Sequence, residues 1–258
     1  MGKKQQVISK LFELCKKRND FVFDNKLVKK VCAKIGFKNP YDVTKIDNSS
    51  ILPSDVREQD YFIIHLGMGT HQFVRGVHFG YHKFEPISDD EKIRWKYRKS
   101  LLNEFDTSES NILSVANNQR ILHDFLYKDM VASPKAYNSR RTKKSITYFV
   151  GDELIKTTNL QMEIDFTLEY HGDVTIIEAK NKYPEDFAVY QLFHPYKYYR
   201  KLKKEENVAI KQISSCYILR GQSEEGSVLR LYKYTFADEN QIGSIQLVEK
   251  AEYSLVKR

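Results

Sequence analysis

The sequence predicts a mixed α/β protein with a winged-helix-like N-terminal region. Apolar residues recur with helical spacing over residues 5–18 and 25–35, whereas strand-like runs dominate beyond about residue 145. A charged stretch that opens with Pro86 separates the two regions and has the composition of a linker. We therefore expect an N-terminal domain over residues 1–85, a linker over 86–106 and an α/β domain over 107–258.

The composition is that of a folded chain that does not enter a membrane. Of the 258 residues, 17 are Tyr and 15 are Phe, so disorder is excluded as the main state. The apolar runs, such as residues 61–64, are far shorter than the roughly 20 residues that span a bilayer. No basic-then-apolar leader opens the chain, and its three Cys lack metal-binding spacing. We expect a cytoplasmic protein without zinc or an iron–sulfur cluster.

The positive charge is concentrated at the N-terminus. Residues 1–38 contain 11 Lys or Arg and three acidic residues, so this segment carries the whole net charge of +8 and the remainder is neutral. Such asymmetry indicates an anionic partner, either nucleic acid or a membrane surface. A solvated basic helix that only aids solubility is the alternative.

Two basic helices and a hairpin make up the expected N-terminal domain. The first helix covers about residues 5–18, and the second begins at Asp24 or Asn25 and ends at Gly36. Residues 61–66 and 71–75, joined by a Gly-Met-Gly turn, predict a β-hairpin that would be the wing of a winged helix. The recognition helix would then be Asn25–Ile35, and its DNA-binding side chains would be Lys26, Lys29, Lys30 and Lys34.

The C-terminal domain is expected to begin with a helix near Thr107 or Ser108. Strands are expected over residues 145–150, 160–168, 174–179, 216–219, 229–235 and 245–248. Another helix is expected from Pro184 to about Tyr199.

The most informative segment is an acidic residue followed by a Glu-Ala-Lys sequence on an apolar strand. Side chains two residues apart share one face of a strand, so Glu178 and Lys180 point the same way. If the preceding strand pairs antiparallel through the turn at residues 170–173, Asp165 lies beside Glu178. Two neighbouring carboxylates repel each other, and a divalent cation relieves the repulsion. Oxygen ligands suit Mg²⁺.

This arrangement suits phosphodiester hydrolysis. We expect Asp165 and Glu178 to hold Mg²⁺, with the carbonyl of Ala179 as a further candidate ligand; the ion polarises a phosphate and lowers the pKa of water. Lys180 would orient that water and stabilise the charge of the transition state. Whether Lys180 also accepts the proton stays open at this point.

Asp165 and Glu178-Ala-Lys180 after a hydrophobic strand resemble the signature of the PD-(D/E)XK nuclease superfamily. The superfamily includes type II restriction endonucleases, Holliday-junction resolvases and RecB-like exonucleases. The resemblance covers about residues 109–199 and implies a mixed sheet flanked by helices, a restriction-endonuclease-like core.

Further site residues follow from this resemblance. Gln191 matches a Gln that related nucleases place over the active site, whereas Tyr196 stands one position beyond their Tyr because Pro195 intervenes. The alternative is that this helix only packs on the sheet. Glu109 matches an acid from the first core helix, although a Glu in a first turn also suits the helix dipole. Glu163 competes with Asp165 as the metal ligand, and the resemblance favours Asp165.

A basic cluster in the second half of the chain is a further expected DNA contact. The expected side chains are Arg140, Arg141, Lys143 and Lys144, with a solvated loop as the alternative.

The sequence thus predicts a Mg²⁺-dependent type II restriction endonuclease that cuts double-stranded DNA at a specific sequence. The added DNA-reading module favours restriction over resolution of junctions. The resemblance further implies a homodimer and a cognate DNA methyltransferase. The alternatives are a winged-helix DNA-binding regulator with a catalytically inactive α/β domain, and an enzyme of RNA processing.

Overall fold

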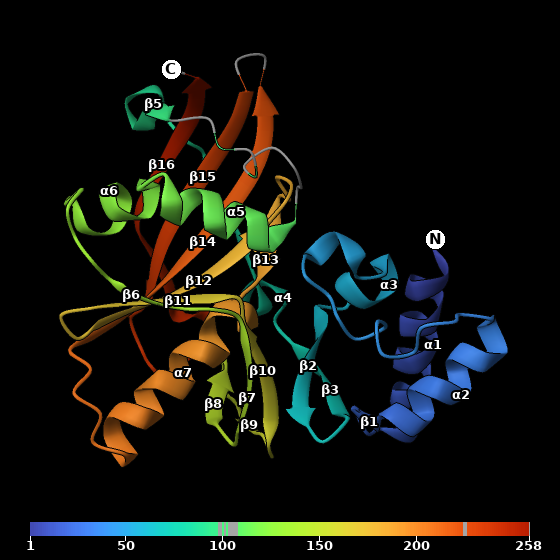
Figure 1. The fold of residues 1–258 in the computed structure, drawn as a ribbon. Helices are drawn as coiled ribbons and strands as arrows, with labels where there is room; N and C mark the ends of the chain where they lie inside the picture. The colour runs from blue at the N-terminus through green and yellow to red at the C-terminus, as the bar shows by residue number, and fades with distance from the viewer. Residues whose placement is uncertain (98–99, 101, 103–107, 224–225, 258) are drawn as a thin grey trace.

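The computed structural model describes the chain except for residues 98–99, 101, 103–107, 224–225 and 258. Its centre is a seven-stranded mixed sheet with the strand order β5-β16-β15-β14-β12-β11-β6 (Figure 1). The pairs β12–β14 and β16–β5 are parallel, and the other neighbours are antiparallel. The strands are β5 (Lys92–Tyr97), β6 (Lys135–Tyr137), β11 (Phe166–Tyr170), β12 (Asp173–Lys180), β14 (Gln212–Ser223), β15 (Gly226–Phe236) and β16 (Ile245–Lys257).

Helices cover both faces of this sheet. The helices α5 (Glu109–Asn118) and α6 (Ile121–Tyr127) share a buried cluster with Ile177 and Ala179 of β12. The helix α7 (Tyr190–Glu205) packs on the opposite face, where its Leu192 shares a second cluster with Ile176. The expected mixed α/β class, a mixed sheet flanked by helices, is confirmed.

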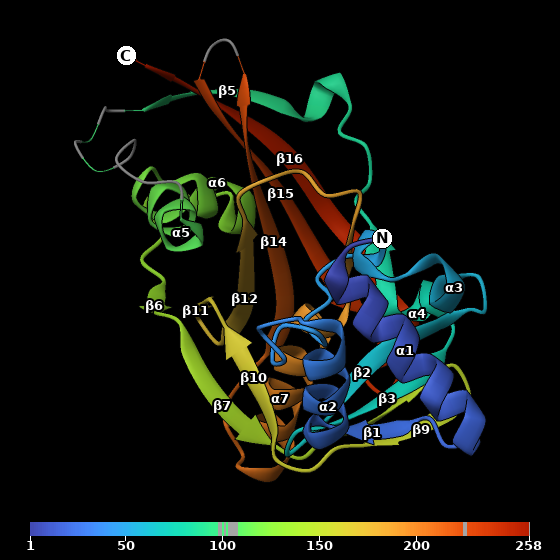
Figure 2. The same cartoon turned by 90° about the vertical axis from the view of Figure 1, so that its right-hand side faces the viewer.

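The N-terminal elements form a smaller unit whose β2 contacts β10 (Leu160–Ile164), the strand that pairs with β7 (Arg140–Lys144) (Figures 1 and 2). A three-stranded antiparallel sheet has the order β1-β3-β2. The elements of the N-terminal unit are α1 (Lys3–Arg18), β1 (Val22–Asp24), α2 (Asn25–Ile35), η1 (Ser49–Ile51), α3 (Ser54–Arg57), β2 (Tyr61–Gly67) and β3 (Thr70–Arg75). Both expected helices and the expected hairpin are confirmed.

Short elements complete the fold. The strand β4 (Tyr81–Lys83), which follows α4 (Val77–Gly80), pairs with β13 (Asp186–Ala188) just before α7. A second ribbon consists of β8 (Thr147–Val150) and β9 (Glu153–Lys156), and two 3₁₀ turns are η2 (Asp89–Glu91) and η3 (Ile242–Ser244). No helix of the described residues has the length and apolar character needed to cross a membrane.

Part of the expected linker is a strand of the main sheet. Residues 92–97 form β5 and pair with the edge of β16. Ile93 and Trp95 pack against the cluster under α5, and Trp95 donates a hydrogen bond to the carbonyl of Gln119 at 3.0 Å. Alternating basic residues hid this two-residue period, because the stretch has the overall composition of a charged loop. Other residues of the expected linker, 98–99, 101 and 103–106, lie outside the described chain.

Several expected boundaries also change. The run over 160–168 is two strands, because β10 pairs with β7 whereas β11 pairs with β12, and Asp165 lies at the break. The helix expected from Pro184 begins at Tyr190, since residues 186–188 are held as β13. The basic segment expected as a loop includes β6 and β7.

Candidate active site

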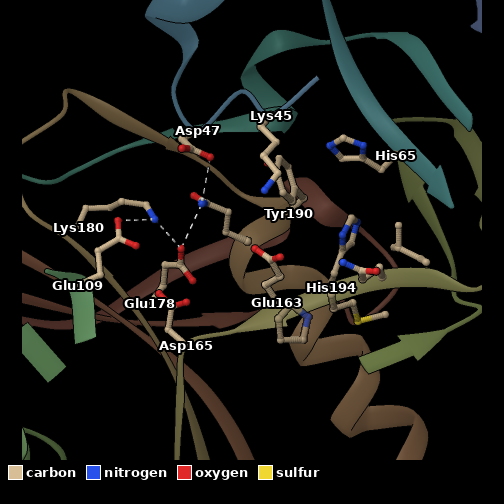
Figure 3. A pocket seen from close by; sticks show the side chains of 15 residues that line it. Lys45, Asp47, His65, Glu109, Glu163, Asp165, Glu178, Lys180, Tyr190 and His194 are labelled. Carbon is tan, nitrogen blue, oxygen red and sulfur yellow. Dashed lines mark hydrogen bonds and ion pairs between the residues drawn. The ribbon is translucent and has the colours of Figure 1, made fainter. Parts of the chain in front are cut away.

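A pocket of about 450 Å³ opens where the N-terminal unit meets the main sheet and α7 (Figure 3). The residues that line it come from the loop before η1, from β2, α5, β10 and β12, and from the first turns of α7. They are Lys45, Asp47, His65, Glu109, Leu160, Gln161, Met162, Glu163, Asp165, Glu178, Lys180, Tyr190, Gln191, His194 and Pro195. The fold therefore brings the five expected catalytic side chains, Glu109, Asp165, Glu178, Lys180 and Gln191, to one cavity.

Strand alternation separates the polar and apolar side chains of β12. Ile177 and Ala179 are fully buried under α5, whereas Glu178 and Lys180 face the pocket on the other side of the strand. The ammonium group of Lys180 lies 3.0 Å from Oε1 of Glu178. The expected shared face of these two residues is confirmed.

The hairpin of β11 and β12 brings Asp165 to the same place. Tyr170 pairs with Asp173 and Phe166 pairs with Ile177, so Asp165, one residue before β11, comes level with Glu178. Its Oδ2 accepts a hydrogen bond from the amide of Ala179 at 3.4 Å. The expected antiparallel pairing through the turn at 170–173 is confirmed.

Burial and three charged groups set the electrostatics of the site. Glu178 is 8% exposed, and burial raises its pKa to about 8, although the neighbouring ammonium group of Lys180 opposes the rise. Burial lowers the pKa of Lys180, but the carboxylates of Glu178 and Glu109 outweigh it and hold the pKa well above its usual value. Glu109, the first residue of α5, lies 3.0 Å from Lys180. Lys180 is therefore a fixed cation between the carboxyl groups of Glu178 and Glu109.

Gln191 links both sides of the pocket. Its side-chain amide donates to Oε1 of Glu178 at 3.2 Å and to Oδ1 of Asp47 at 3.4 Å. Its carbonyl oxygen accepts a hydrogen bond from the hydroxyl of Tyr217 at 3.2 Å. Tyr217 is 1% exposed and thus fixes which end of the amide faces the carboxylates. Gln191 lies in the pocket, and is not only a packing residue of α7.

Other candidates from the sequence lie differently. Tyr196 is buried against Phe193 and Phe236 and does not line the pocket. Glu163 does line it, but its carboxylate is half-exposed and forms an ion pair with Arg141 at 2.9 Å. Asp165 is the one of the two acids that contacts β12.

Sequence reasoning missed the residues that the N-terminal unit contributes. Lys45 and Asp47 lie in a polar loop without a recognisable motif. Only the fold brings this loop to α7, whose Gln191 is 144 residues from Asp47 in the sequence. His65 comes from β2, and its Nδ1 lies 3.0 Å from Nδ1 of His71. Burial, reinforced by the charge of Lys45, lowers the pKa of His65 to about 4, so this imidazole is neutral at pH 7.

The expected DNA-binding residues lie on two surfaces. Lys26, Lys29, Lys30 and Lys34 are exposed on α2. The other four lie on β7, whose partner β10 lines the pocket. Arg141 and Lys144 form ion pairs with Glu163 and Glu206, both at 2.9 Å, while the guanidinium group of Arg140 stacks over the ring of Tyr199. The β7 cluster is therefore partly neutralised, whereas the α2 lysines form no ion pair among the described residues.

Two family models match the chain. A domain of unknown function (DUF6996) covers residues 5–73, and a second domain of unknown function (DUF6997) covers residues 77–254. The chain belongs to the DUF6997 family. No curated protein matches it. The two matches of this DUF6997 protein meet at the end of β3, ahead of the expected boundary at residue 85, and the pocket is lined by residues of both.

The pocket of the DUF6997 protein offers oxygen ligands from β12 and from Asp165, the residue between β10 and β11. Among the described residues no group of three or more His, Cys, Asp or Glu side chains is placed to hold one ion. Mg²⁺ commonly takes only one or two carboxylates and keeps several waters. The hydrogen bonds from Lys180 and Gln191 both reach Oε1 of Glu178, and Asp165 uses Oδ2 to accept the amide of Ala179. The second oxygens of the two carboxyl groups, together with a pocket that has room for coordinating waters, suit Mg²⁺.

Proposed function

We propose that this protein is a Mg²⁺-dependent type II restriction endonuclease of the PD-(D/E)XK type, which hydrolyses double-stranded DNA at a specific sequence. The observation that carries the proposal is the convergence of Asp165, Glu178 and Lys180 in one pocket, with Gln191 hydrogen-bonded to Glu178. The polarity of the pocket and its position between two units suit a nucleic-acid backbone better than a small apolar ligand.

The raised pKa of Glu178 supports a cation at this place. A buried carboxyl group near Asp165 and Glu109 is costly to ionise, and a divalent cation lowers that cost. Asp165 and Glu178 would hold Mg²⁺, with the carbonyl of Ala179 as the expected third ligand. When bound, Mg²⁺ supplies positive charge that polarises the phosphodiester and activates water for attack.

The protein's own groups perform the remaining tasks. Lys180 is already held beside Glu178, so its ammonium group can stabilise the negative charge that develops on the phosphate without rearranging first. Glu109 holds the other side of that ammonium group and keeps it protonated, which makes Lys180 an electrostatic group rather than a base. Gln191 orients the carboxylate of Glu178.

The N-terminal unit supports the DNA-binding part of the proposal. Its helix–strand–helix order and its β1-β3-β2 sheet support the proposal of a winged helix, in which β2 and β3 would form the wing. The helix α2 would enter a major groove, with Lys26, Lys29, Lys30 and Lys34 along the phosphates. As in type II restriction enzymes, a homodimer would cut both strands, and a cognate methyltransferase would protect the host DNA.

Cleavage of plasmid and phage DNA with and without Mg²⁺ tests the proposal. We expect discrete fragments only with Mg²⁺, and no cleavage by D165N, E178Q or K180M. The matched control K182M changes an exposed lysine two residues further along, and E163Q changes the competing acid. Both should cut normally. All three site variants should still shift duplex DNA in Ca²⁺.

The outcomes separate the alternatives. A stable shift without cutting by the wild type supports a DNA-binding regulator with an inactive α/β domain. Preference for duplex RNA over duplex DNA in competition supports RNA processing, because an A-form helix presents a different groove and 2′-hydroxyl groups. Unimpaired cleavage by the three site variants overturns the assignment of the site.

A further inference from the structure

One wall of the pocket belongs to the N-terminal unit. Lys45 and Asp47 lie on the loop between α2 and η1. Within the cavity, Lys45 lies apart from Lys180 and Glu109 (Figure 3). The acids of the PD-(D/E)XK signature and Gln191 all come from the other unit. The loop thus lines the pocket without contributing any of the proposed catalytic residues.

This loop is fixed to the C-terminal unit. The carbonyl of Asp47 accepts a hydrogen bond from the amide of Ala188 at 2.8 Å. The amide of Ser49 donates to Oδ1 of Asp186 at 2.7 Å, and the Ser49 hydroxyl donates to the other carboxylate oxygen. Asp186 is only 7% exposed, so these are bonds to a largely buried carboxylate and are correspondingly strong.

Lys45 lies on a fixed backbone within this loop. Its neighbours Thr44 and Ile46 are buried, and its carbonyl accepts a hydrogen bond from the ammonium group of Lys4 at 2.6 Å. The side chain of Lys45 extends into the pocket toward Tyr190 (Figure 3). The backbone is therefore constrained, while the long side chain keeps its reach.

The two ammonium groups of the pocket differ in their partners. Lys180 is held by Glu178 and Glu109, both at 3.0 Å. Lys45 forms no ion pair with any carboxylate in the part of the chain that the structure describes, and the residue is exposed. A lysine that lines this pocket and lacks a carboxylate partner is available to an anionic ligand. Little desolvation opposes that contact.

We infer that Lys45 binds a DNA phosphate adjacent to the scissile one, so that the N-terminal unit forms the phosphate-binding wall of the catalytic pocket. This inference rests on the proposed nuclease function. The scissile phosphate lies at the carboxylates and Lys180, and the neighbouring phosphate of the same strand extends along the pocket toward Lys45. The loop clamped to Asp186 then sets the distance between the two phosphate contacts.

The inference has a quantitative signature in cleavage kinetics. A charge-assisted contact contributes about 1.5–3 kcal/mol, so K45M should lower kcat/KM by about 10- to 100-fold. The effect should lie mostly in KM, because the contact is made in the ground state and the transition state alike. K45R should restore most of the loss, because an arginine keeps the charge and reaches the same phosphate.

The matched control is K38M, which removes the same charge from an exposed lysine outside the pocket. We would use a short duplex around a mapped cleavage position and measure single-turnover cleavage in Mg²⁺. A second series replaces single phosphates near that position by uncharged methylphosphonates. At one position, the substitution should slow the wild type and K38M but leave K45M unaffected, because the two changes remove the same contact.

Each outcome decides between the two proposals. The inference is supported if K45M lowers kcat/KM, if K45R restores it, and if the effects of K45M and of one methylphosphonate are not additive. Equal cleavage by K45M and K38M, or additive losses at every phosphate, overturns the inference and leaves the nuclease proposal intact. Absence of cleavage by the wild type overturns both.

Discussion

Gln191 donates one amide group to the carboxylates of both Glu178 and Asp47, at 3.2 and 3.4 Å. Glu178 lies in the region matched by the DUF6997 model, and Asp47 lies in the region matched by the DUF6996 model. The position of the glutamine is therefore determined by both regions together. The proposed nuclease site depends on the docking of the two units.

Asp47 acts as a positioning residue for Gln191. We expect D47A to lower kcat by about 3- to 10-fold with little change in KM, since one of the two acceptors that orient the amide is lost. D47N keeps Oδ1 as an acceptor and should retain most of the rate. D42A removes a surface carboxylate from the same loop, whose partner Lys4 lies at 3.1 Å, and should have no effect. A merely structural role for Asp47 would lower the melting temperature and leave kcat unchanged.

Glu178 should make the metal-free protein less stable as the pH rises. Its pKa in the folded protein is about 8, above the ordinary value of 4.5, so the folded state holds the proton more tightly than the unfolded state. Stability from this group is complete below pH 4.5 and is lost as the pH rises toward 8. E178Q removes the dependence and should stabilise the protein by on the order of 1–3 kcal/mol at pH 8.

Denaturant unfolding in EDTA at pH 5 and pH 8 measures this effect. The increase in the free energy of unfolding caused by E178Q should be large at pH 8 and small at pH 5. E185Q, on a largely exposed carboxylate, serves as the control. An equal gain at both pH values would show that the stabilisation has another origin.

Mg²⁺ should make the wild type more stable than E178Q, the reverse of their order in EDTA at pH 8. A ligand at a concentration of 100 times its Kd stabilises the folded state by about 2.7 kcal/mol, so the wild type should melt at a higher temperature as Mg²⁺ is added. D165N and E178Q should show little response, whereas E163Q should respond like the wild type. Thermal melts over a Mg²⁺ titration check this. An undiminished response of D165N and E178Q would place the ion elsewhere.

Acid should destabilise the protein through His194. Burial lowers the pKa of this imidazole to about 3, and its Nε2 lies 3.1 Å from the hydroxyl of Tyr148. The unfolded state binds a proton below about pH 6.5 and the folded state does not, so stability falls as the pH drops from 6.5 toward 3. H194Q should flatten this part of the profile, and H78Q, on an exposed histidine, should not. The free energy of unfolding, measured between pH 4 and 7, tests this prediction. Parallel pH profiles of the unfolding free energy for the wild type and H194Q would contradict the role given to His194.

The central strands could be predicted because their pattern is local. The alternation along β12 and the short turn into it from β11 fix the relation of Asp165, Glu178 and Lys180 within 16 residues of sequence, and the fold keeps it. The period of β5 was hidden by its basic residues. Pairing with β16, far along the chain, decided its conformation.

Lys45 and Asp47 could not be predicted for a related reason. Their loop has no periodic pattern, and its place is set by hydrogen bonds to Asp186 and Ala188. Such contacts depend on how two units dock, and no local propensity encodes that. The boundary expected at residue 85 rests on local composition, whereas β4 just before it pairs with β13, which is distant in the sequence.

The most direct test of the proposed metal centre is a crystal structure with Mn²⁺ in place of Mg²⁺ and a short duplex bound. We expect an anomalous diffraction peak at about 2.0–2.2 Å from one oxygen each of Asp165 and Glu178, as for a small, oxygen-ligated divalent cation. The peak should disappear in E178Q. DNA bound in the pocket with no peak between these two carboxylates, or with the ion at another group of side chains, would contradict the central claim.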